Sequence, residues 1–287
     1  GVVIRTGAAV REILIEDEPT YAGGVLVSSR RVARGVVTED GKTFRARAVV
    51  SNLNPKLLYE RLVAPEALPD DFRERIARYR CGSGTFRMNV ALDRLPTFTC
   101  KPEPGDHLTG GIVIAPSLAY MDRAYDTARK NGWSEEPIVE VLIPSTLDDT
   151  LAPPGKHVAS LFCQHVQPQL SGGRSWDDHR DAVADLMIAT VDKHAPGFAK
   201  SVLGRQINSP LDLERTFGLV NGDIMHGALS LDQLFSARPV LGHGDYRGPI
   251  KGLYMCGAGT HPGGGVTGAP GHNAARVINR DFRSHRI

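Results

Sequence analysis

A glycine-rich segment near the C-terminus constrains the fold more than any other part of the sequence. The stretch "GAGTHPGGGVTGAPGHNAAR" covers residues 257–276 and has seven glycines in its first fifteen positions. It continues the run "GLYMCGAG", which predicts a buried strand, and it leads into a helical pattern. A strand, a glycine loop and a helix start together aim backbone N–H groups and the positive end of a helix dipole at a ligand. We therefore expect an anionic or electron-rich ligand at this loop.

Two familiar ligand-binding fingerprints do not fit this segment. In a dinucleotide-binding fingerprint, Gly257 and Gly259 would require a third glycine at the position of Pro262. A phosphate-binding P-loop does not fit either, because the only "GKT" occupies residues 41–43, inside an evident hairpin. A purely structural role stays open, since glycines also serve tight turns and close helix packing. Against that role, three consecutive glycines at 263–265 make it entropically costly to order the chain.

The helix after the glycines is expected to start at the edge of the same sheet. Pro270 suits a first helical turn, and Thr267 or Gly268 is the expected N-cap. The free N–H groups of residues 265–268 would then lie where open α/β sheets bind their ligands. The inward side of this helix is expected to carry Ala274, Ala275 and Ile278.

Composition and charge argue against several classes of protein. Of the 287 residues 41% are hydrophobic and 23% are charged, which is ordinary for a folded globular protein. The formal net charge is +2 and the arginines are scattered among acids, so we expect no nucleic-acid partner. The four cysteines lie far apart without a CxxC pair, which indicates neither a disulfide framework nor a zinc site. We expect a reducing, cytoplasmic location.

The first part of the chain is rich in strand patterns. Short β-rich runs extend to residue 52, and Asp40-Gly41 between two of them predicts a hairpin. A helix pattern starts at Pro55 and another covers residues 70–79. The chain opens in strand-like sequence without a methionine, so we interpret it as a piece of a longer protein.

The middle of the chain predicts a mainly antiparallel sheet that carries helices. One helix is expected at 118–130, and a long amphipathic helix is expected after an N-cap at Ser175 or Asp177. The strand patterns are "TFRMNVALD", "GGIVIAPS", "PIVEVLIPST" and "HVASLFCQHV". After Ser209 we expect mostly loops until the strand "GLYMCGAG", which needs parallel neighbours from near the N-terminus.

These segments together strongly resemble the phytoene-desaturase-like FAD-dependent oxidoreductases. "GLYMCGAGTHPGGGVTGAPGHNAARVI" resembles the closing FAD-binding motif of that family, and "SPLDLERTFGLVNGDIMHGALSLDQLFSARP" resembles the segment before it. "GVVTEDGKTFRARAVVSNLNP" resembles part of the family's FAD domain. The family begins with a βαβ unit whose GxGxxG holds the ADP half of FAD, and no such motif occurs in this sequence. The chain therefore resembles the C-terminal portion of such an enzyme.

The resemblance implies an α/β fold combined with α+β. A partial FAD/NAD(P)-binding, Rossmann-like domain would be formed by residues 1–52 and 211–287. A substrate domain with a mainly antiparallel sheet and helices would be formed by residues 53–210.

The resemblance also implies which residues bind FAD. The pyrophosphate and ribityl chain would be bordered by Gly257, Ala258, Gly259 and Thr260. N–H groups near the pyrimidine edge of the flavin would come from Gly265, Val266 and Thr267. Val10 matches the position whose main chain meets the adenine, and Ser51 and Asn52 end a strand that returns toward the cofactor. Because the GxGxxG unit is absent, we expect this chain alone to bind FAD weakly or not at all.

Two histidines are candidates for catalysis, and neither is decided by its sequence context. His261 lies inside the glycine motif and would either carry a proton or hydrogen-bond a loop carbonyl. His226 lies in a segment that the family folds over the active site, although histidine beside glycine is also common in turns. We expect no metal site, because His157, Cys163 and His165 share one strand face without an acidic partner.

Two functions remain open at this point. The first is an FAD-dependent oxidoreductase that dehydrogenates, saturates or isomerises a hydrophobic polyene or lipid-like substrate by hydride transfer to flavin. The second is a non-catalytic fragment or interaction module that keeps the fold but cannot hold FAD alone. The expected partners are a hydrophobic small molecule and either the missing N-terminal segment or a second copy of the chain. The resemblance also leaves open a peripheral contact with a membrane.

Overall fold

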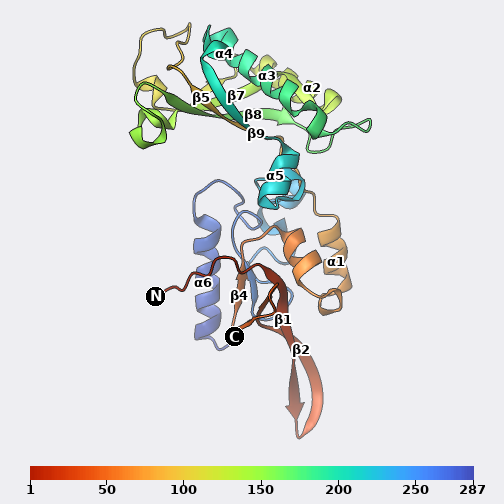
Figure 1. Cartoon of the computed structure of the whole chain (residues 1–287). Coiled ribbons are helices and arrows are strands. Elements are labelled where there is room, and N and C mark those ends of the chain that lie inside the picture. Colours follow the sequence, from red (N-terminus) through yellow and green to blue (C-terminus); the bar gives the residue numbers. More distant parts are fainter. The chain divides into compact units, whose positions relative to one another are not determined.

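The computed structural model describes residues 1–287 and divides them into two compact units (Figure 1). Unit 1 comprises Gly1–Cys81 and Met225–Ile287, and unit 2 comprises Gly82–Ile224. Unit 1 thus joins the two ends of the chain, whereas unit 2 is one continuous segment.

Three antiparallel strands form the first sheet of unit 1. They are β1 (Val10–Ala22), β2 (Val25–Thr38) and β3 (Thr43–Arg45), in the order β1-β2-β3. β2 and β3 are joined by the predicted Asp40-Gly41 hairpin, in which the Thr38 N–H donates to the Lys42 carbonyl over 2.9 Å. The Thr38 hydroxyl also donates to the Asp40 carboxylate over 2.5 Å, which stabilises the turn.

A parallel pair forms the second sheet of unit 1. β10 (Leu253–Met255) pairs with β4 (Val49–Ser51) in parallel register, Leu253 opposite Val49. This pairing confirms the expectation that the strand before the glycines finds its parallel neighbour near the N-terminus. The side chains of all three β10 residues are buried, because the strand lies between the core of unit 1 and the C-terminal helix.

The segment after β4 packs into unit 1. A π-helical segment (Leu57–Leu62) and α1 (Asp70–Ala77) supply buried side chains to the core that also holds Leu253 and Met255. The boundary between the compact units therefore lies at 81/82, and the second boundary lies at 224/225, instead of the expected 52/53 and 210/211. The difference arises because the apolar faces of these helices complete the core around β10. The assignment of cofactor and substrate binding to the two parts stays a prediction.

Unit 2 is a five-stranded antiparallel sheet with helices packed against it, as the sequence predicted. The strand order is β6-β7-β8-β5-β9. The strands are β5 (Phe86–Leu92), β6 (Ile112–Ile114), β7 (Trp133–Leu142), β8 (His157–Val166) and β9 (Val202–Asn208). The helices are α2 (Leu118–Asn131), α3 (Trp176–His194), α4 (Phe198–Ser201) and α5 (Pro210–Phe217). In neither unit does a helix combine the length and the apolar composition that a membrane span requires.

The long helix α3 covers one face of this sheet. Its buried residues, among them Val183, Met187 and Val191, share a core with alternate residues of β5, β7 and β8. The helix begins at Ser175, whose side chain accepts the Asp177 N–H over 3.1 Å, so Ser175 is the N-cap of the two candidates.

Two elements of unit 2 were not foreseen. β9 adds a fifth strand at the edge of the sheet, and four of its seven residues are exposed in succession. α5 begins at Ser209, where a loop was expected, and it is stabilised by a capping box in which Ser209 and Asp212 bond each other's backbone N–H groups.

The C-terminal helix α6 (Ala269–Arg283) packs against β10 through few buried residues. Gly268 is its N-cap, as one of the two expected candidates, and Pro270 lies in its first turn. Ala274 is buried, but Ala275 is exposed and Ile278 is half-buried, so the expected inward side was wrong for Ala275. The inward stripe instead follows Pro270, Ala274 and Asp281, which are spaced by about one and two helical turns.

A buried carboxylate fastens the far end of α6. Asp281 is 2% exposed and accepts two hydrogen bonds from the Arg247 guanidinium, over 2.8 and 2.7 Å. The Tyr254 hydroxyl of β10 donates to the same carboxylate over 2.8 Å. Hydrogen bonding to Arg247 lowers the pKa of Asp281, and burial raises the pKa of Tyr254.

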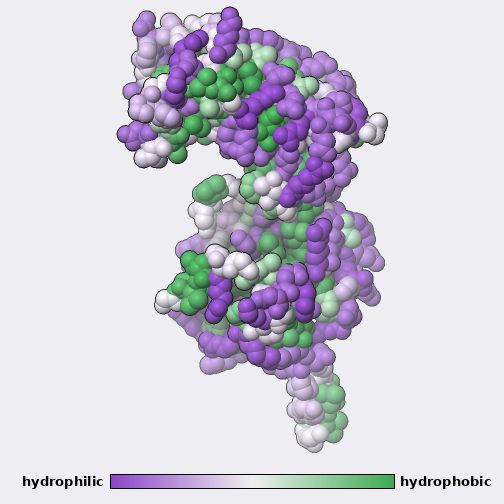
Figure 2. All heavy atoms as spheres, in the orientation of Figure 1, coloured by the Kyte–Doolittle hydropathy of each residue, from purple (hydrophilic) through white to green (hydrophobic).

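The β1–β2 hairpin extends beyond the short strand β3 and ends in an apolar tip. The space-filling view shows hydrophobic residues at the end of this arm (Figure 2). The exposed apolar residues at the tip are Tyr21, Val25, Leu26 and Val27. Nearer the core, ion pairs cross between strands, such as Arg34 with Glu18 over 2.7 Å.

Asp281→Asn is expected to lower the free energy of unfolding by about 2 kcal/mol at neutral pH, because the Arg247 guanidinium loses its buried counter-charge and keeps only the exposed Asp245 carboxylate. The pKa of Asp281 is lower in the folded state than the ordinary value of 3.8. The ionised Asp281 carboxylate therefore stabilises the fold fully at pH values above its ordinary pKa. This stabilisation is lost as the pH falls through the pKa of Asp281 in the folded state. Chemical denaturation of both proteins between pH 7 and pH 2 measures the difference.

The matched control is Asp71→Asn, which breaks an exposed pair with Arg75 on α1 and should change stability by no more than about 0.5 kcal/mol. Equal stability of the Asp281→Asn variant and the parent at neutral pH would contradict this account of the helix anchor.

Candidate cofactor-binding site

The carboxyl ends of β4 and β10 bring several predicted residues together. The two parallel strands end at the same edge, where the Cys256 N–H donates to the Ser51 carbonyl over 2.8 Å. Gly257 has a φ of +83°, and a Cβ at this position would lie 3.3 Å from the Asn52 Cβ. Ser51, Asn52 and Gly257 are therefore neighbours. Glycine suits position 257 because it adopts the left-handed backbone easily and has no Cβ to crowd Asn52.

The first part of the glycine loop turns back on itself. The N–H and the hydroxyl of Thr260 both donate to the Gly257 carbonyl, over 3.1 and 2.9 Å, and the Gly263 N–H donates to the Thr260 carbonyl over 2.7 Å. Thr260 is buried, so its hydroxyl serves the turn itself. A contribution of Thr260 to cofactor binding would therefore have to come from its position and not from a free side chain.

The glycine tract presents a series of backbone donors. The N–H groups of Gly257, Ala258 and Gly259, and those of residues 264–268, make no hydrogen bond within the protein. Gly265, Val266 and Thr267 are exposed. The segment leads directly into the N-terminus of α6, a helix of 15 residues, where the Thr267 hydroxyl oxygen accepts the Ala269 N–H over 3.2 Å. Donors and the positive end of a helix dipole favour an anionic or electron-rich group at this edge.

An apolar groove of about 420 Å³ lies along β4 and includes Val10. Ser51 and Asn52 line the same groove, so the structure places three predicted cofactor residues around one hollow. Its other lining residues are Ile13, Val36, Val49, Val50, Leu53, Leu57, Arg61 and Leu62. Apart from Arg61 these are apolar, which suits a flat, largely uncharged group better than a phosphate.

Tyrosine hydroxyls hold the main chain at both candidate histidines. The Tyr246 hydroxyl donates to the His261 carbonyl over 2.9 Å, and the His261 ring lies 5.8 Å from that of Phe235. The Tyr79 hydroxyl donates to the His226 carbonyl over 2.9 Å. These contacts fix the backbone of each histidine, and the proposed roles of their imidazoles stay predictions.

A fully buried arginine behind the loop was not foreseen. Arg238 has no exposed surface, and its Nε and Nη2 both donate to the Ala258 carbonyl, over 3.0 and 2.7 Å. In the sequence it is a single arginine before a proline in "FSARPV", which gives no sign of burial.

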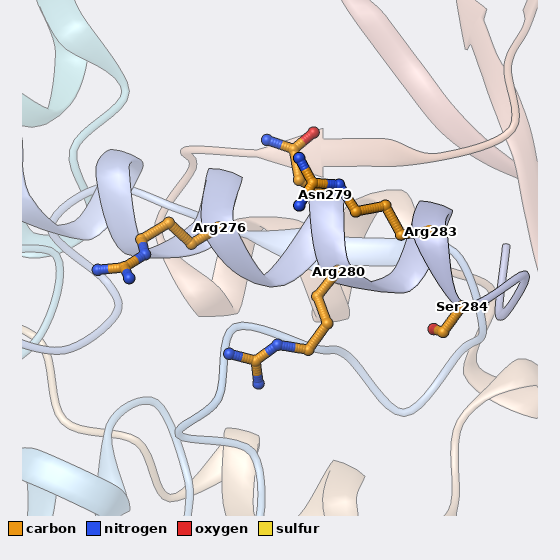
Figure 3. Close-up of a pocket in the computed structure, with 5 residues that line it drawn as sticks. All are labelled: Arg276, Asn279, Arg280, Arg283 and Ser284. Atoms are coloured by element: carbon orange, nitrogen blue, oxygen red, sulfur yellow. The ribbon is translucent and has the colours of Figure 1, made fainter.

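A second hollow, of about 480 Å³, follows the exposed face of α6. It is lined by Arg276, Asn279, Arg280, Arg283 and Ser284. Figure 3 shows that the arginine side chains leave the helix in different directions and do not converge on one point. This basic surface therefore differs from the glycine loop, where the donors are backbone N–H groups of consecutive residues.

The described residues contain no group of three or more His, Cys, Asp and Glu side chains arranged to hold a metal ion. Cys163 is buried in β8, and burial raises the pKa of its thiol. Burial also lowers the pKa of the neighbouring His165. Both shifts follow from the apolar packing of the sheet.

Comparison with curated proteins gives matches along almost the whole chain. Over 98% of its length the chain is 44% identical to pyridine nucleotide-disulfide oxidoreductase domain-containing protein 2 of Mus musculus, of which it covers 49%. It is 31% identical over 98% of its length to one of the subunits of limonene dehydrogenase from Castellaniella defragrans, of which it covers 52%. It is 25% identical over 93% of its length to a phytoene desaturase of Fusarium fujikuroi, of which it covers 45%. The chain thus spans about half the length of the curated relatives it matches.

Among solved structures, an oxidoreductase from Methanosarcina mazei matches with a TM-score of 0.55. The match covers 96% of this chain and 49% of that one at 18% identity, so it shows the fold alone. No family model matches the chain. Together these findings confirm the resemblance to phytoene-desaturase-like oxidoreductases and the expected fold class.

Gly265→Asp is expected to weaken FAD binding about tenfold without unfolding the protein, because it places a carboxylate beside the donors that face the ligand. A Cβ at this position has nothing closer than the Thr267 Cγ2, at 4.0 Å. The dissociation constant measured by titration, together with circular dichroism of the variant, checks both parts.

Gly242→Asp is the matched control. Gly242 is exposed, has a φ of +92° and leaves open space where a Cβ would lie, so the same change should leave FAD binding unaltered. If both variants weaken binding equally, the glycine tract has no special role as an anion-binding segment.

Proposed function

Because the chain resembles phytoene-desaturase-like oxidoreductases over nearly all its length, we propose that it is part of an FAD-dependent oxidoreductase. The proposed reaction is the dehydrogenation, saturation or isomerisation of a hydrophobic polyene or lipid-like substrate. The observation that carries the proposal is the edge shared by β4 and β10. There, unbonded backbone N–H groups and the start of α6 follow directly on a buried parallel strand.

The residues at this edge fit FAD. Gly257, Ala258 and Gly259 would face the pyrophosphate and ribityl part, and Gly265–Thr267 would face the pyrimidine edge of the ring. An electron-rich ring edge is stabilised by N–H donors and by the positive end of α6. Val10 would meet the adenine with its main chain, beside the apolar groove that Ser51 and Asn52 also line.

The proposed hydride transfer requires few acid or base groups from the protein. When bound, FAD supplies the acceptor for a hydride from a substrate carbon. The chain would contribute binding, orientation and exclusion of water. His261 and His226 are proposed as proton carriers on the basis of their positions in the motif and in the preceding segment.

The substrate class is supported by the names of the relatives. Limonene and phytoene are hydrocarbons, and a site for them would be apolar. We propose that unit 2, with its antiparallel sheet, supplies most of the substrate contacts, as the sequence resemblance implies.

The second candidate is a module that keeps this fold without catalysis. The two candidates are separated by the full-length protein that contains this chain. A yellow full-length protein with flavin absorption supports the oxidoreductase, and a full-length protein that stays colourless with excess FAD supports the module.

This chain alone is expected to bind FAD with a dissociation constant above about 1 µM. A site that contacts only part of FAD loses most of the same association entropy but makes fewer contacts. Titration with FAD, followed by flavin fluorescence, measures the constant. Binding well below that value would mean that these residues include an adenosine site of their own.

The open side of β4 is expected to be covered by a further segment of the protein or by a second copy of the chain. Val50 is 46% exposed beside the apolar groove, and an uncovered parallel strand invites pairing. Val50→Lys should therefore reduce self-association by this chain, measured by sedimentation velocity. Leu203→Lys on β9, also exposed, is the control, and an equal effect of both changes would argue against this interface.

A further inference from the structure

The buried Arg238 guanidinium is surrounded by backbone carbonyls. Besides its two bonds to Ala258, it donates to the carbonyls of Met225 (2.7 Å), Gln233 (3.2 Å) and Gly227 (3.4 Å). These acceptors come from two segments, the loop at 225–233 and the glycine loop. A single side chain therefore ties the two segments together.

None of these acceptors is a carboxylate. An arginine side chain stays protonated in proteins, so a full positive charge lies behind the glycine loop with only carbonyl dipoles around it. Burying a charge without a counter-charge is unfavourable, and hydrogen bonds to neutral acceptors offset the cost only in part. Such a charge favours an anion on the other side of the loop.

The contact with Ala258 also determines where the next backbone donor points. The peptide between Ala258 and Gly259 is trans, so its carbonyl and its N–H point in opposite directions. Because Arg238 binds the carbonyl from the inside, the Gly259 N–H is turned away from the guanidinium, and it makes no hydrogen bond within the protein. A Cβ at Gly259 would lie 2.8 Å from the Pro55 Cδ, so the backbone packs too closely on Pro55 for a larger residue to fit here.

Neighbouring contacts make this arrangement rigid. The Gln233 side chain accepts the Arg80 N–H over 2.7 Å and donates to the Arg80 carbonyl over 3.0 Å. Gly264 packs so closely on Met225 that a Cβ would lie 2.5 Å from the Met225 Sδ. The loop that holds Arg238 is thus fixed from both sides.

We infer that Arg238 is a positioning residue for the phosphate-bearing part of the cofactor. It orients the 258–259 peptide so that the Gly259 N–H faces the ligand, and it supplies the buried positive charge that favours the diphosphate. The inference rests on the proposed function for the identity of the ligand, but the orientation of the loop is a property of this chain alone.

The test compares Arg238→Lys and Arg238→Gln with the parent chain. Lysine keeps the charge with fewer donors, and glutamine removes the charge. The control is Arg276→Gln, which removes an exposed charge from α6 in the same unit. Two readouts are needed: hydrogen exchange of the hydrogen-bonded Thr260 and Gly263 amides in the loop, and dissociation constants for FAD and for riboflavin, which lacks phosphate.

We expect hydrogen exchange of the Thr260 and Gly263 amides, which are hydrogen-bonded within the loop, to rise at least about tenfold in both Arg238 variants and not in the control. FAD should bind about tenfold more weakly to Arg238→Gln, whereas the constant for riboflavin should change less than about threefold. Arg238→Lys should recover part of the loss for FAD, because it keeps the charge.

Unchanged exchange in the loop would overturn the positioning role, and equal losses for FAD and riboflavin would overturn the role of the charge. If Arg238→Gln does not fold, the lysine variant decides by the same two readouts. If the full-length protein that contains this chain also binds neither ligand, the proposed function fails, and the exchange data still decide whether Arg238 orients the loop.

Discussion

The parallel pairing of β10 with β4 is the contact on which the rest of unit 1 depends. It connects Leu253 to Val49 and thereby joins segments from opposite ends of the chain. Three-residue strands have too few hydrogen bonds to hold such a pair alone, so the stabilisation must come from burial. The side chains of Leu253 and Met255 share a core with Leu58 and Phe72, which explains why the helices after β4 belong to unit 1.

Local signals in the sequence were sufficient for much of this architecture. Asp40-Gly41 predicted its hairpin because few residues adopt that turn easily, and Ser175 predicted a helix start because its side chain replaces a missing backbone partner. The order of strand, glycines and helix at 252–283 predicted the edge of the candidate site. In each case the residues that determine the local structure lie close together in the sequence.

The sequence was less informative where partners come from distant segments. Arg238 gave no signal, because its carbonyl acceptors belong to two separate loops. Edge strand β9 lacks an apolar alternation, because four of its residues in succession are exposed. The inward stripe of α6 was misplaced at Ala275. By contrast α5 could have been predicted, because Ser209, Pro210 and Asp212 form a recognisable capping pattern.

The side-chain contacts at the far end of α6 also influence the glycine loop at its start. Asp281 binds Arg247 and Tyr254, and the Arg47 guanidinium lies 4.5 Å from the Phe282 ring, whereas Gly268 at the other end has no side-chain cap. The helix is about 22 Å long. A small rotation at its C-terminal end would therefore move its N-terminus further than it moves the residues near Asp281. The direction of the dipole at the glycine loop therefore depends in part on contacts at the opposite end of the helix. Changes at Arg47 or Phe282 should therefore disturb the glycine loop, although Phe282 lies at the other end of the helix.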